Sequence, residues 1–321
     1  MRRVTAWVMA MLLVVVIVPL LMVRCTGPWG PGRAPAPVDT IRVYHHLTGQ
    51  VIEEPMDEYL TCVTAAEMPA AFETEALKSQ AVAARTYAVV KRQAAQENPD
   101  PNGAHKGADV CTDFNCCQAY TTKEDALAKW GTDGAGNWDK IACAVSSTHG
   151  EVVTYQGEPI RAVFHSSSSG QTENSRDVWG GDFPYLASVD SPGEEACPYH
   201  TSTVEVPVDE WKAKLSAAAE GISFDDANLF GDFVRSGAGG VLTVTMGDHV
   251  FKGTEIRSIF GLRSACFDAA YQDGKIVFFV TGNGHGVGMS QYGANAMAQQ
   301  GADYQAILTH YYTGTVVEKI G

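Results

Sequence analysis

The sequence has little positive charge and no run of lysine and arginine. Its 321 residues include 23 Lys and Arg against 37 Asp and Glu, which gives a formal net charge of −14. A protein that binds a phosphate backbone needs a basic surface, so the composition argues against a nucleic-acid partner. Charged residues are 19% of the chain and apolar residues 45%, as in an ordinary globular protein. The chain also has no internal repeat, and its length suits a short anchor plus one large domain.

The N-terminus carries the long uncharged stretch of the chain. Val4 to Val23 is 20 residues without a charge, which as a helix can cross a hydrocarbon core of about 30 Å. Arg2 and Arg3 precede it, so the positive-inside rule predicts a cytoplasmic N-terminus and export of the remainder. A cleaved signal peptide is the alternative, but the stretch is longer than a usual apolar region and no A-x-A-like site follows. We therefore expect residues 1–25 to be a single-pass anchor in the cell membrane, with the domain outside the cytoplasm.

The rest of the chain divides into a spacer and one domain. Residues 26–38 are rich in Pro and Gly and predict a spacer, and residues 39–321 predict one domain, open to division into two lobes around a cleft. The pattern predicts helices from Pro55 to Met68, Thr74 to about Gln96, Lys123 to Trp130, Ser290 to Gln300 and Asp303 to Tyr312. A first strand is expected at Ile41–Tyr44. Beyond Ile141 the period shifts to two, and further strands are expected at Val152–Tyr155, Ile160–His165, Val241–Met246 and Lys275–Val280. The expected fold class is α+β, with mixed helices and antiparallel strands forming a cleft, helices at the ends and strands in the middle.

Four motifs follow one another along the domain. They are MPAAFETEALKSQAVAARTY at residues 68–87, HSSSSGQT at 165–172, FGLRS at 260–264 and GHGVGMSQYG at 284–293. In this order they resemble the stage II sporulation protein D and amidase-enhancer family over nearly everything after the spacer. The resemblance implies lytic transglycosylation of peptidoglycan glycan strands during engulfment in sporulation. It also implies two partners: the amidase called stage II sporulation protein P and the membrane scaffold called stage II sporulation protein M.

The same resemblance places the essential glutamate of the family at Glu75. A lytic transglycosylase can work with one carboxyl group, which protonates the leaving oxygen and then takes the proton of the sugar's C6 hydroxyl as this closes onto C1. Taken from the residues alone, an acidic side chain in the first turn of a helix is explained more simply by the helix dipole. Glu67 and Glu73 are competitors in or beside the same motif, and Glu67 could cap a helix or pair with Arg85.

The serine-rich motif is expected to contact the sugar strand. Hydroxyl and amide groups at the end of a predicted strand match the hydroxyls of a glycan. With the resemblance we assign substrate binding to Ser167, Ser169 and Gln171, whereas a polar turn that bonds its own backbone is the alternative. Tyr185 and Trp179 could stack on sugar rings or belong to the core.

The glycine-rich motif predicts a loop that needs positive φ angles or a close backbone approach. Five glycines lie around His285, and no lysine occupies the position that a phosphate-binding loop requires. Ser290 is expected to cap the helix that follows. We expect His285, Gln291 and Tyr292 to line the cleft wall opposite Glu75.

A polar loop concentrates thiols and an imidazole. Four donors suited to tetrahedral zinc lie within thirteen residues, namely His105, Cys111, Cys116 and Cys117. With every position filled by protein, the zinc would be structural, and no cofactor would be required for the chemistry. Adjacent side chains seldom reach one metal, so Cys116 or Cys117 could instead form a disulfide with Cys62 or Cys143, or stay a free thiol.

Two other functions remain open from the sequence. The domain is shared with amidase enhancers, so a non-enzymatic glycan-binding activator of a cell-wall amidase is the main alternative. A zinc hydrolase is the weaker one, because it needs an open metal position and the four-donor cluster looks full.

Overall fold

The computed structural model describes residues 39–225 and 229–320. The chain divides into two compact units, Met1–Thr40 and Ile41–Gly321, and of the first only residues 39–40 are described. The predicted anchor (residues 1–25) and spacer (residues 26–38) therefore lie outside the described residues. Within the part that is described, no helix has the length and apolar character needed to cross a membrane.

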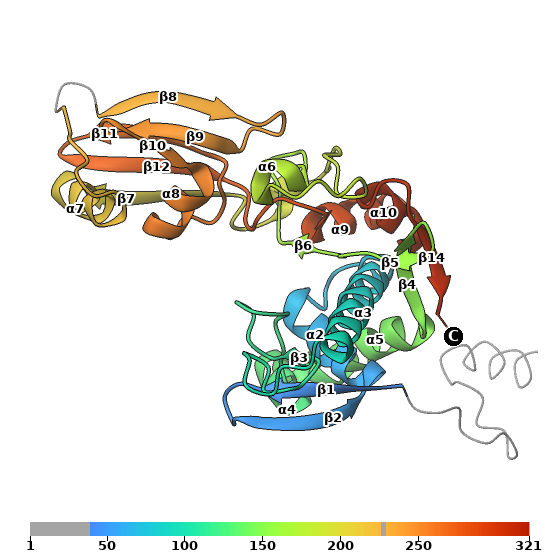
Figure 1. Ribbon diagram of the computed structural model, residues 1–321. Helices are drawn as coiled ribbons and strands as arrows, with labels where there is room; N and C mark the ends of the chain where they lie inside the picture. The colour runs from blue at the N-terminus through green and yellow to red at the C-terminus, as the bar shows by residue number, and fades with distance from the viewer. Residues whose placement is uncertain (1–38, 226–228, 321) are drawn as a thin grey trace, which may run out of the picture. The chain divides into compact units, whose positions relative to one another are not determined.

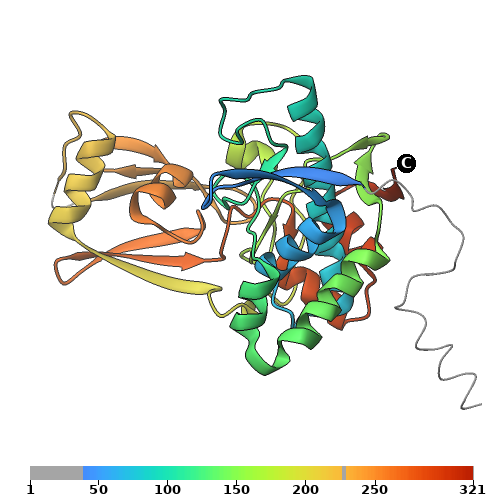
Figure 2. The same cartoon turned by 90° about the horizontal axis from the view of Figure 1, so that it is seen from below.

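The second unit mixes helices with small sheets (Figures 1 and 2). The helices are α2 (Met56–Glu67), α3 (Thr74–Glu97), α4 (Lys123–Trp130), α5 (Gly134–Ser147), α6 (Ser175–Trp179), α7 (Val208–Ala218), α8 (Gly253–Phe260), α9 (Gln291–Gln299) and α10 (Tyr304–Tyr311). The strands are β1 (Thr40–His45), β2 (Gln50–Pro55), β3 (Val110–Cys111), β4 (Glu151–Tyr155), β5 (Glu158–Pro159), β6 (Phe164–His165), β7 (Thr201–Pro207), β8 (Phe230–Arg235), β9 (Val241–Met246), β10 (His249–Lys252), β11 (Phe267–Gln272), β12 (Lys275–Thr281), β13 (Met289–Ser290) and β14 (Val316–Lys319). Because most strand pairs are antiparallel, the predicted α+β class is confirmed. Two pairs, β1 with β3 and β13 with β6, are parallel.

Helix α3 takes part in two hydrophobic clusters. Ala76 and Ala83 pack into one cluster with residues of α5, α9 and α10, and Ala84 and Ala88 pack into another with α2 and β1. Small side chains allow this because neighbouring backbone can approach the helix on more than one side. This alanine-rich helix is therefore buried on more than one side, and Figures 1 and 2 both show α2 and α5 beside it.

Residues 201–281 form a separate core, and we call this segment the strand lobe and the rest of residues 41–320 the helix lobe. Two three-stranded sheets, β10-β9-β8 and β11-β12-β7, enclose a cluster with α7 and α8. Trp211 is fully buried there, with the rings of Phe224 and Phe230 at 5.3 and 5.7 Å. The first and last residues of the strand lobe are neighbours, because Thr201 of β7 lies opposite Thr281 of β12 in an antiparallel pair.

Three expectations about the elements are wrong. Helix α5 was not expected, and it continues to Ser147 beyond Ile141, where the period was expected to shift to two, because Trp138, Ile141 and Ala144 recur at helical spacing and are buried. The strand expected at 160–165 is limited to Phe164–His165, which is the part that pairs with β13. Helices are not confined to the ends of the domain, since α7 and α8 interrupt the strands of the middle.

Candidate active site

Glu67 is a half-buried carboxylic acid at the C-terminal end of α2. Its Oε1 accepts a hydrogen bond from Ala119 N at 2.8 Å, and its Oε2 accepts one from Gln291 Nε2 at 3.3 Å. Burial raises the pKa of the Glu67 carboxyl above its ordinary value, and the two hydrogen bonds oppose this rise. Arg85, which the sequence offered as one possible partner of Glu67, instead forms an ion pair with Asp57 at 3.1 Å. Glu67 is thus a desolvated acid whose hydrogen-bond donors are neutral.

An amide cluster adjoins Glu67. The Nε2 of Gln291 lies 3.4 Å from Oε1 of Gln80, a side chain that is 0% exposed. Among the described residues, the Nε2 of Gln80 has no hydrogen-bond partner. A buried amide donor is costly to leave unpaired, so the cluster holds an unused donor close to the carboxyl.

Glu75 has a different environment in the first turn of α3. Its side chain is 31% exposed, its Oε1 forms an ion pair with Lys78 Nζ at 2.7 Å, and its Oε2 accepts a hydrogen bond from Tyr304 N at 3.0 Å. Tyr304 is the first residue of α10, so the carboxylate also lies at a helix N-terminus. Both oxygens of the Glu75 carboxyl group are therefore engaged by hydrogen-bond donors of this fold. Glu73, the third acid of the motif, is exposed and precedes α3 as its N-cap residue.

The segment between α2 and α3 is fixed by contacts from two helices. Lys140 of α5 donates hydrogen bonds from Nζ to Ala70 O at 2.9 Å and to Phe72 O at 2.5 Å. Asn295 of α9 accepts from Glu73 N at 2.8 Å, and the ring of Phe72 meets that of Tyr292 edge-on at 5.0 Å. Helices α5 and α9 therefore set the position of the loop that separates Glu67 from Glu75.

The serine-rich and glycine-rich motifs lie side by side. Strands β6 and β13 pair in parallel, with Phe164 opposite Met289 and His165 opposite Ser290. Gly284 has a φ of +124°, and a Cβ there would come within 2.6 Å of His165 Cβ, so the predicted need for close approach is confirmed. The predicted cap is also confirmed, because Ser290 Oγ accepts a hydrogen bond from Gly293 N at 3.2 Å.

A buried acid that the sequence did not single out connects these motifs. Glu194 is 2% exposed, and its Oε1 accepts hydrogen bonds from Ser168 Oγ at 2.7 Å and Ser191 Oγ at 2.6 Å. The hydroxyl of Tyr311 lies 2.7 Å from Ser191 Oγ and extends the network to α10. Burial raises the pKa of the Glu194 carboxyl, while the serine hydroxyls lower it.

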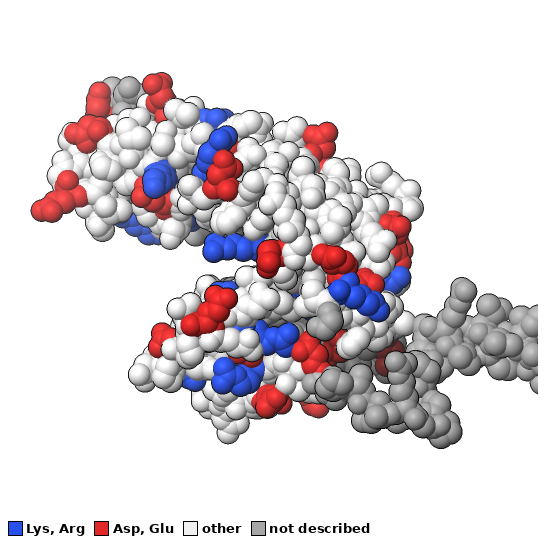
Figure 3. All heavy atoms as spheres, turned by 45° about the vertical axis from the view of Figure 1, so that its right-hand side comes forward, with Lys and Arg blue, Asp and Glu red and all other residues white. Residues whose placement is uncertain are grey.

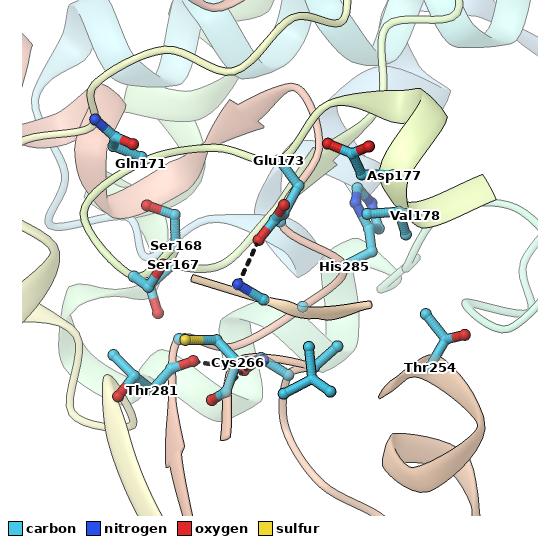
Figure 4. Close-up of a pocket in the computed structure, with 18 of the residues that line it drawn as sticks. Ser167, Ser168, Gln171, Glu173, Asp177, Val178, Thr254, Cys266, Thr281 and His285 are labelled. Carbon is cyan, nitrogen blue, oxygen red and sulfur yellow. Dashed lines mark hydrogen bonds between the residues drawn. The ribbon is translucent and has the colours of Figure 1, made fainter. Parts of the chain in front are cut away.

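The two motifs also line a small cavity of about 40 Å³ (Figure 4). This is room for a few water molecules. Its lining includes Ser167, Ser169, Gln171, Glu173, Asp177 and His285 from the helix lobe, and Gly240, Val241, Thr254, Cys266 and Thr281 from the strand lobe. Glu173 Oε1 accepts a hydrogen bond from Gly240 N at 3.0 Å, and burial raises the pKa of the Glu173 carboxyl.

Two imidazoles stand beside this cavity. The ring of His285 lies 5.6 Å from that of His165 and 5.1 Å from that of Trp179. His165 donates from Nδ1 to Val287 O at 3.2 Å, and its buried Nε2 has no partner among the described residues. Burial lowers the pKa of His165 to about 3 and that of His285 to about 4, so both rings are neutral at physiological pH.

The predicted binding residues fall into three places. Ser167, Ser169, Gln171 and His285 line the cavity, although Ser169 Oγ donates to Ala238 O at 2.7 Å and Gln171 Nε2 donates to Asp190 Oδ1 at 2.8 Å. Gln291 and Tyr292 lie near Glu67 and Phe72 instead. Tyr185 packs against Tyr155 and Phe183, with ring centroids 5.5 and 5.9 Å away. Their roles in binding stay predictions.

The four predicted zinc ligands come together. The donor atoms of His105, Cys111, Cys116 and Cys117 all lie within 4.8 Å of one another. His105 Nε2 is 3.2 Å from Cys116 Sγ and 3.3 Å from Cys117 Sγ, so the thiols of two adjacent cysteines lie beside the same imidazole nitrogen. Donors around tetrahedral zinc stand roughly 3.3–3.8 Å apart, and the two distances from His105 Nε2 lie near this range, within a cluster whose donors are at most 4.8 Å apart. Cys62, Cys116 and Cys117 carry free thiols, which removes the suggested disulfide between them.

Charges on the surface are mixed. On the face shown in Figure 3, acidic and basic side chains alternate over both lobes, with no extended basic stripe. A ligand with many negative charges has no complementary surface on this face.

Comparison with known proteins identifies clear relatives. Residues 44–155 match a family model described as stage II sporulation protein. The chain is 38% identical over 298 residues to stage II sporulation protein D of Bacillus amyloliquefaciens, an alignment that covers 92% of this chain and 83% of that protein. It is 37% identical over 281 residues to stage II sporulation protein D of Bacillus subtilis (strain 168), with 87% and 79% covered. It is also 28% identical over 302 residues to an amidase enhancer of the same strain, covering 78% of this chain and 39% of the enhancer.

Proposed function

The chain belongs to the stage II sporulation protein D family, and from this we propose that it cleaves peptidoglycan glycan strands as a lytic transglycosylase during sporulation. The family name supports the sporulation context. The resemblance of the four motifs supports the chemistry. The half-buried Glu67 carboxyl group with its neutral amide neighbours is the observation on which the catalytic part of the proposal depends.

In this proposal Glu67, rather than Glu75, is the general acid. A proton donor must hold its proton near neutral pH, and burial raises the pKa of Glu67 in that direction. The side chain is half-buried, so a glycosidic oxygen can still reach it. Gln291 and Gln80 offer neutral amides beside the reacting carboxyl.

The reaction needs one carboxyl group acting twice. Glu67 donates its proton to the glycosidic oxygen as the C1–O bond breaks, and the C6 hydroxyl of the same sugar attacks C1. The Glu67 carboxylate then accepts the hydroxyl proton, which restores the acid and leaves a 1,6-anhydro end. Atoms and protons balance without a water molecule or a second carboxylate. The rate should fall as the pH rises through the raised pKa of Glu67, because the anion cannot protonate the leaving group.

Glu75 is the competing assignment, and its contacts suit a structural role. Lys78 and the N-terminus of α10 hold its carboxylate, which ties α3 to α10. A group whose two oxygens are engaged by an ammonium and by a main-chain N–H is poorly placed to give a proton to a substrate.

The test compares three isosteric changes in or beside the first motif. Purified full-length protein with Glu67→Gln, Glu75→Gln or Glu73→Gln is incubated with peptide-free glycan strands, and anhydro ends are quantified by mass spectrometry. We expect Glu67→Gln to lose roughly 10²–10⁴-fold in rate, the contribution of a general acid. Glu73→Gln is the matched control, because its carboxylate is exposed. If Glu67→Gln keeps its full rate and Glu75→Gln loses it, the general acid is Glu75 instead of Glu67.

Activation of an amidase is the second candidate function. The similarity to an amidase enhancer over 302 residues favours it. If the parent protein and all three variants fail to release anhydro ends but accelerate a cell-wall amidase equally, this candidate replaces the enzyme.

We also propose structural zinc at His105, Cys111, Cys116 and Cys117. One imidazole and three thiols complete a tetrahedral set, and the free thiols lie close enough to share an ion. Bound zinc would supply only cross-linking of the loop between α3 and α4. Its four donors leave no open position for a substrate, which argues against a zinc hydrolase.

The cellular setting completes the proposal. The uncharged stretch Val4–Val23 supports a membrane anchor with the domain outside the cytoplasm. The family resemblance supports association with stage II sporulation proteins P and M.

A further inference from the structure

The cavity of Figure 4 has walls of two chemical kinds. Val178, Val241, Leu242 and Ala265 provide an apolar side, whereas Ser167, Glu173 and Thr281 provide hydroxyl and carboxyl groups. A small ligand group that fits must therefore carry both a methyl-sized apolar end and hydrogen-bonding atoms.

Ser167 provides an unused hydrogen-bonding group at this cavity. Its side chain is 2% exposed, and its Oγ has no hydrogen-bond partner among the described residues. Two hydrogen bonds with Asn283, at 3.0 and 2.7 Å, fix the main chain of Ser167 at the cavity wall. A buried hydroxyl without a partner costs free energy that a ligand atom can recover.

The opposite wall supplies an acceptor. In Figure 4 the Glu173 carboxyl points into the cavity, toward Gly240 N. A Cβ at Gly240 would overlap Glu173 Oε1, so glycine keeps the backbone close to this acid. The cavity thus places a hydroxyl and a carboxyl against an apolar wall.

An exposed aromatic ring stands next to the cavity. Trp179 is 47% exposed, and its ring lies 5.1 Å from that of His285, which lines the cavity. Large exposed indole rings are typical platforms for the apolar face of a sugar. A sugar stacked on Trp179 would bring its ring substituents to the cavity mouth.

We propose that this cavity binds the N-acetyl group of an amino sugar, with Ser167 as the specificity-determining residue. The methyl group packs on Val178, Val241 and Ala265, the carbonyl oxygen accepts a hydrogen bond from Ser167 Oγ, and the amide N–H donates to the Glu173 carboxyl. The inference rests on the proposed glycan function and narrows it to N-acetylated strands. The cavity volume of about 40 Å³ leaves room for a small substituent such as an acetyl group.

Binding by the full-length chain tests this without requiring cleavage. The probes are β-1,4-linked tetramers of N-acetylglucosamine and of glucose, which are both neutral and differ in the acetamido and hydroxyl groups at C2. Calorimetry should show the acetylated tetramer binding at least about tenfold more tightly. Ser167→Ala should weaken that binding about fivefold to tenfold and leave the glucose tetramer unaffected.

Ser202→Ala is the matched control. Ser202 Oγ is another hydroxyl without a partner among the described residues, but it lies on β7 and does not line the cavity. Its removal should change neither affinity, and thermal unfolding checks that both variants fold. Equal binding of the two tetramers, or unchanged binding by Ser167→Ala, would overturn the N-acetyl inference alone. Failure of both tetramers to bind would overturn it together with the proposed function.

Discussion

Replacing Gly293 by alanine should disrupt the Glu194 network. A Cβ at Gly293 would overlap Tyr311 Oη and Ser191 Oγ and would come within 3.3 Å of Glu194 Oε1. Displaced hydrogen bonds to a buried charged group cost roughly 1.5–3 kcal/mol each, whereas alanine in a helix gains roughly 0.5–1 kcal/mol over glycine. We therefore expect Gly293→Ala to lower the free energy of unfolding by about 2–4 kcal/mol.

Gly136→Ala provides a comparison of opposite sign. Gly136 lies in α5 and is exposed, and no atom from another part of the fold lies within 4 Å of the place that a Cβ would occupy. At Gly136 only the higher helix propensity of alanine acts, so the free energy of unfolding should rise by about 0.5–1 kcal/mol. Urea unfolding followed by circular dichroism measures both variants. Equal stability of the two alanine variants would refute the steric reasoning at Gly293.

Three further results are expected. Nuclear magnetic resonance titration should show the ring protons of His165 and His285 unchanged between pH 7 and 5, because burial holds their pKa values near 3 and 4. Histidine in the unfolded chain protonates at about pH 6.5. The two neutral rings therefore contribute fully to the free energy of unfolding above that pH, and this contribution declines as the pH falls toward 4. Titration of either ring near pH 6.5 would contradict this. A chelator should lower the melting temperature of the zinc-loaded protein, and Cys116→Ser should lower its zinc content. A melting temperature that does not respond to the chelator, together with an unchanged zinc content in Cys116→Ser, would remove the zinc proposal. Lys140→Met should cost about 1–2 kcal/mol and speed hydrogen exchange around Phe72, whereas unchanged exchange would show that Lys140 does not fix this loop.

The sequence predicted the elements whose pattern is local. Helix α3, helix α4 and strand β9 were found because their periodicity is clear and turn residues mark their ends. Helix α5 was missed, since Gly134 and Gly136 weaken its signal and the packing of Trp138 stabilises it from outside. Short strands such as β6 exist only because a distant segment pairs with them, which a local pattern cannot reveal.

The candidate site shows the same division. The zinc ligands were predictable from spacing within one loop, and all four donor atoms do lie together. Glu194 carried no sequence signal, because its importance comes from the hydrogen bond with Ser168, 26 residues earlier, and from Ser191, which links it to Tyr311 near the end of the chain. The sequence could rank Glu67 and Glu75 only by motif, whereas their difference in burial and partners requires the fold.

The strand lobe is an insertion with its two ends adjacent. Thr201 and Thr281 are paired neighbours, and Gly282 N donates to His200 O at 2.6 Å just outside that pair. A short linker could therefore replace residues 201–281 without stretching the helix lobe. Such a miniaturised chain would retain the Glu67 cluster and lose one wall of the acetyl cavity, which would uncouple strand scission from the choice of sugar.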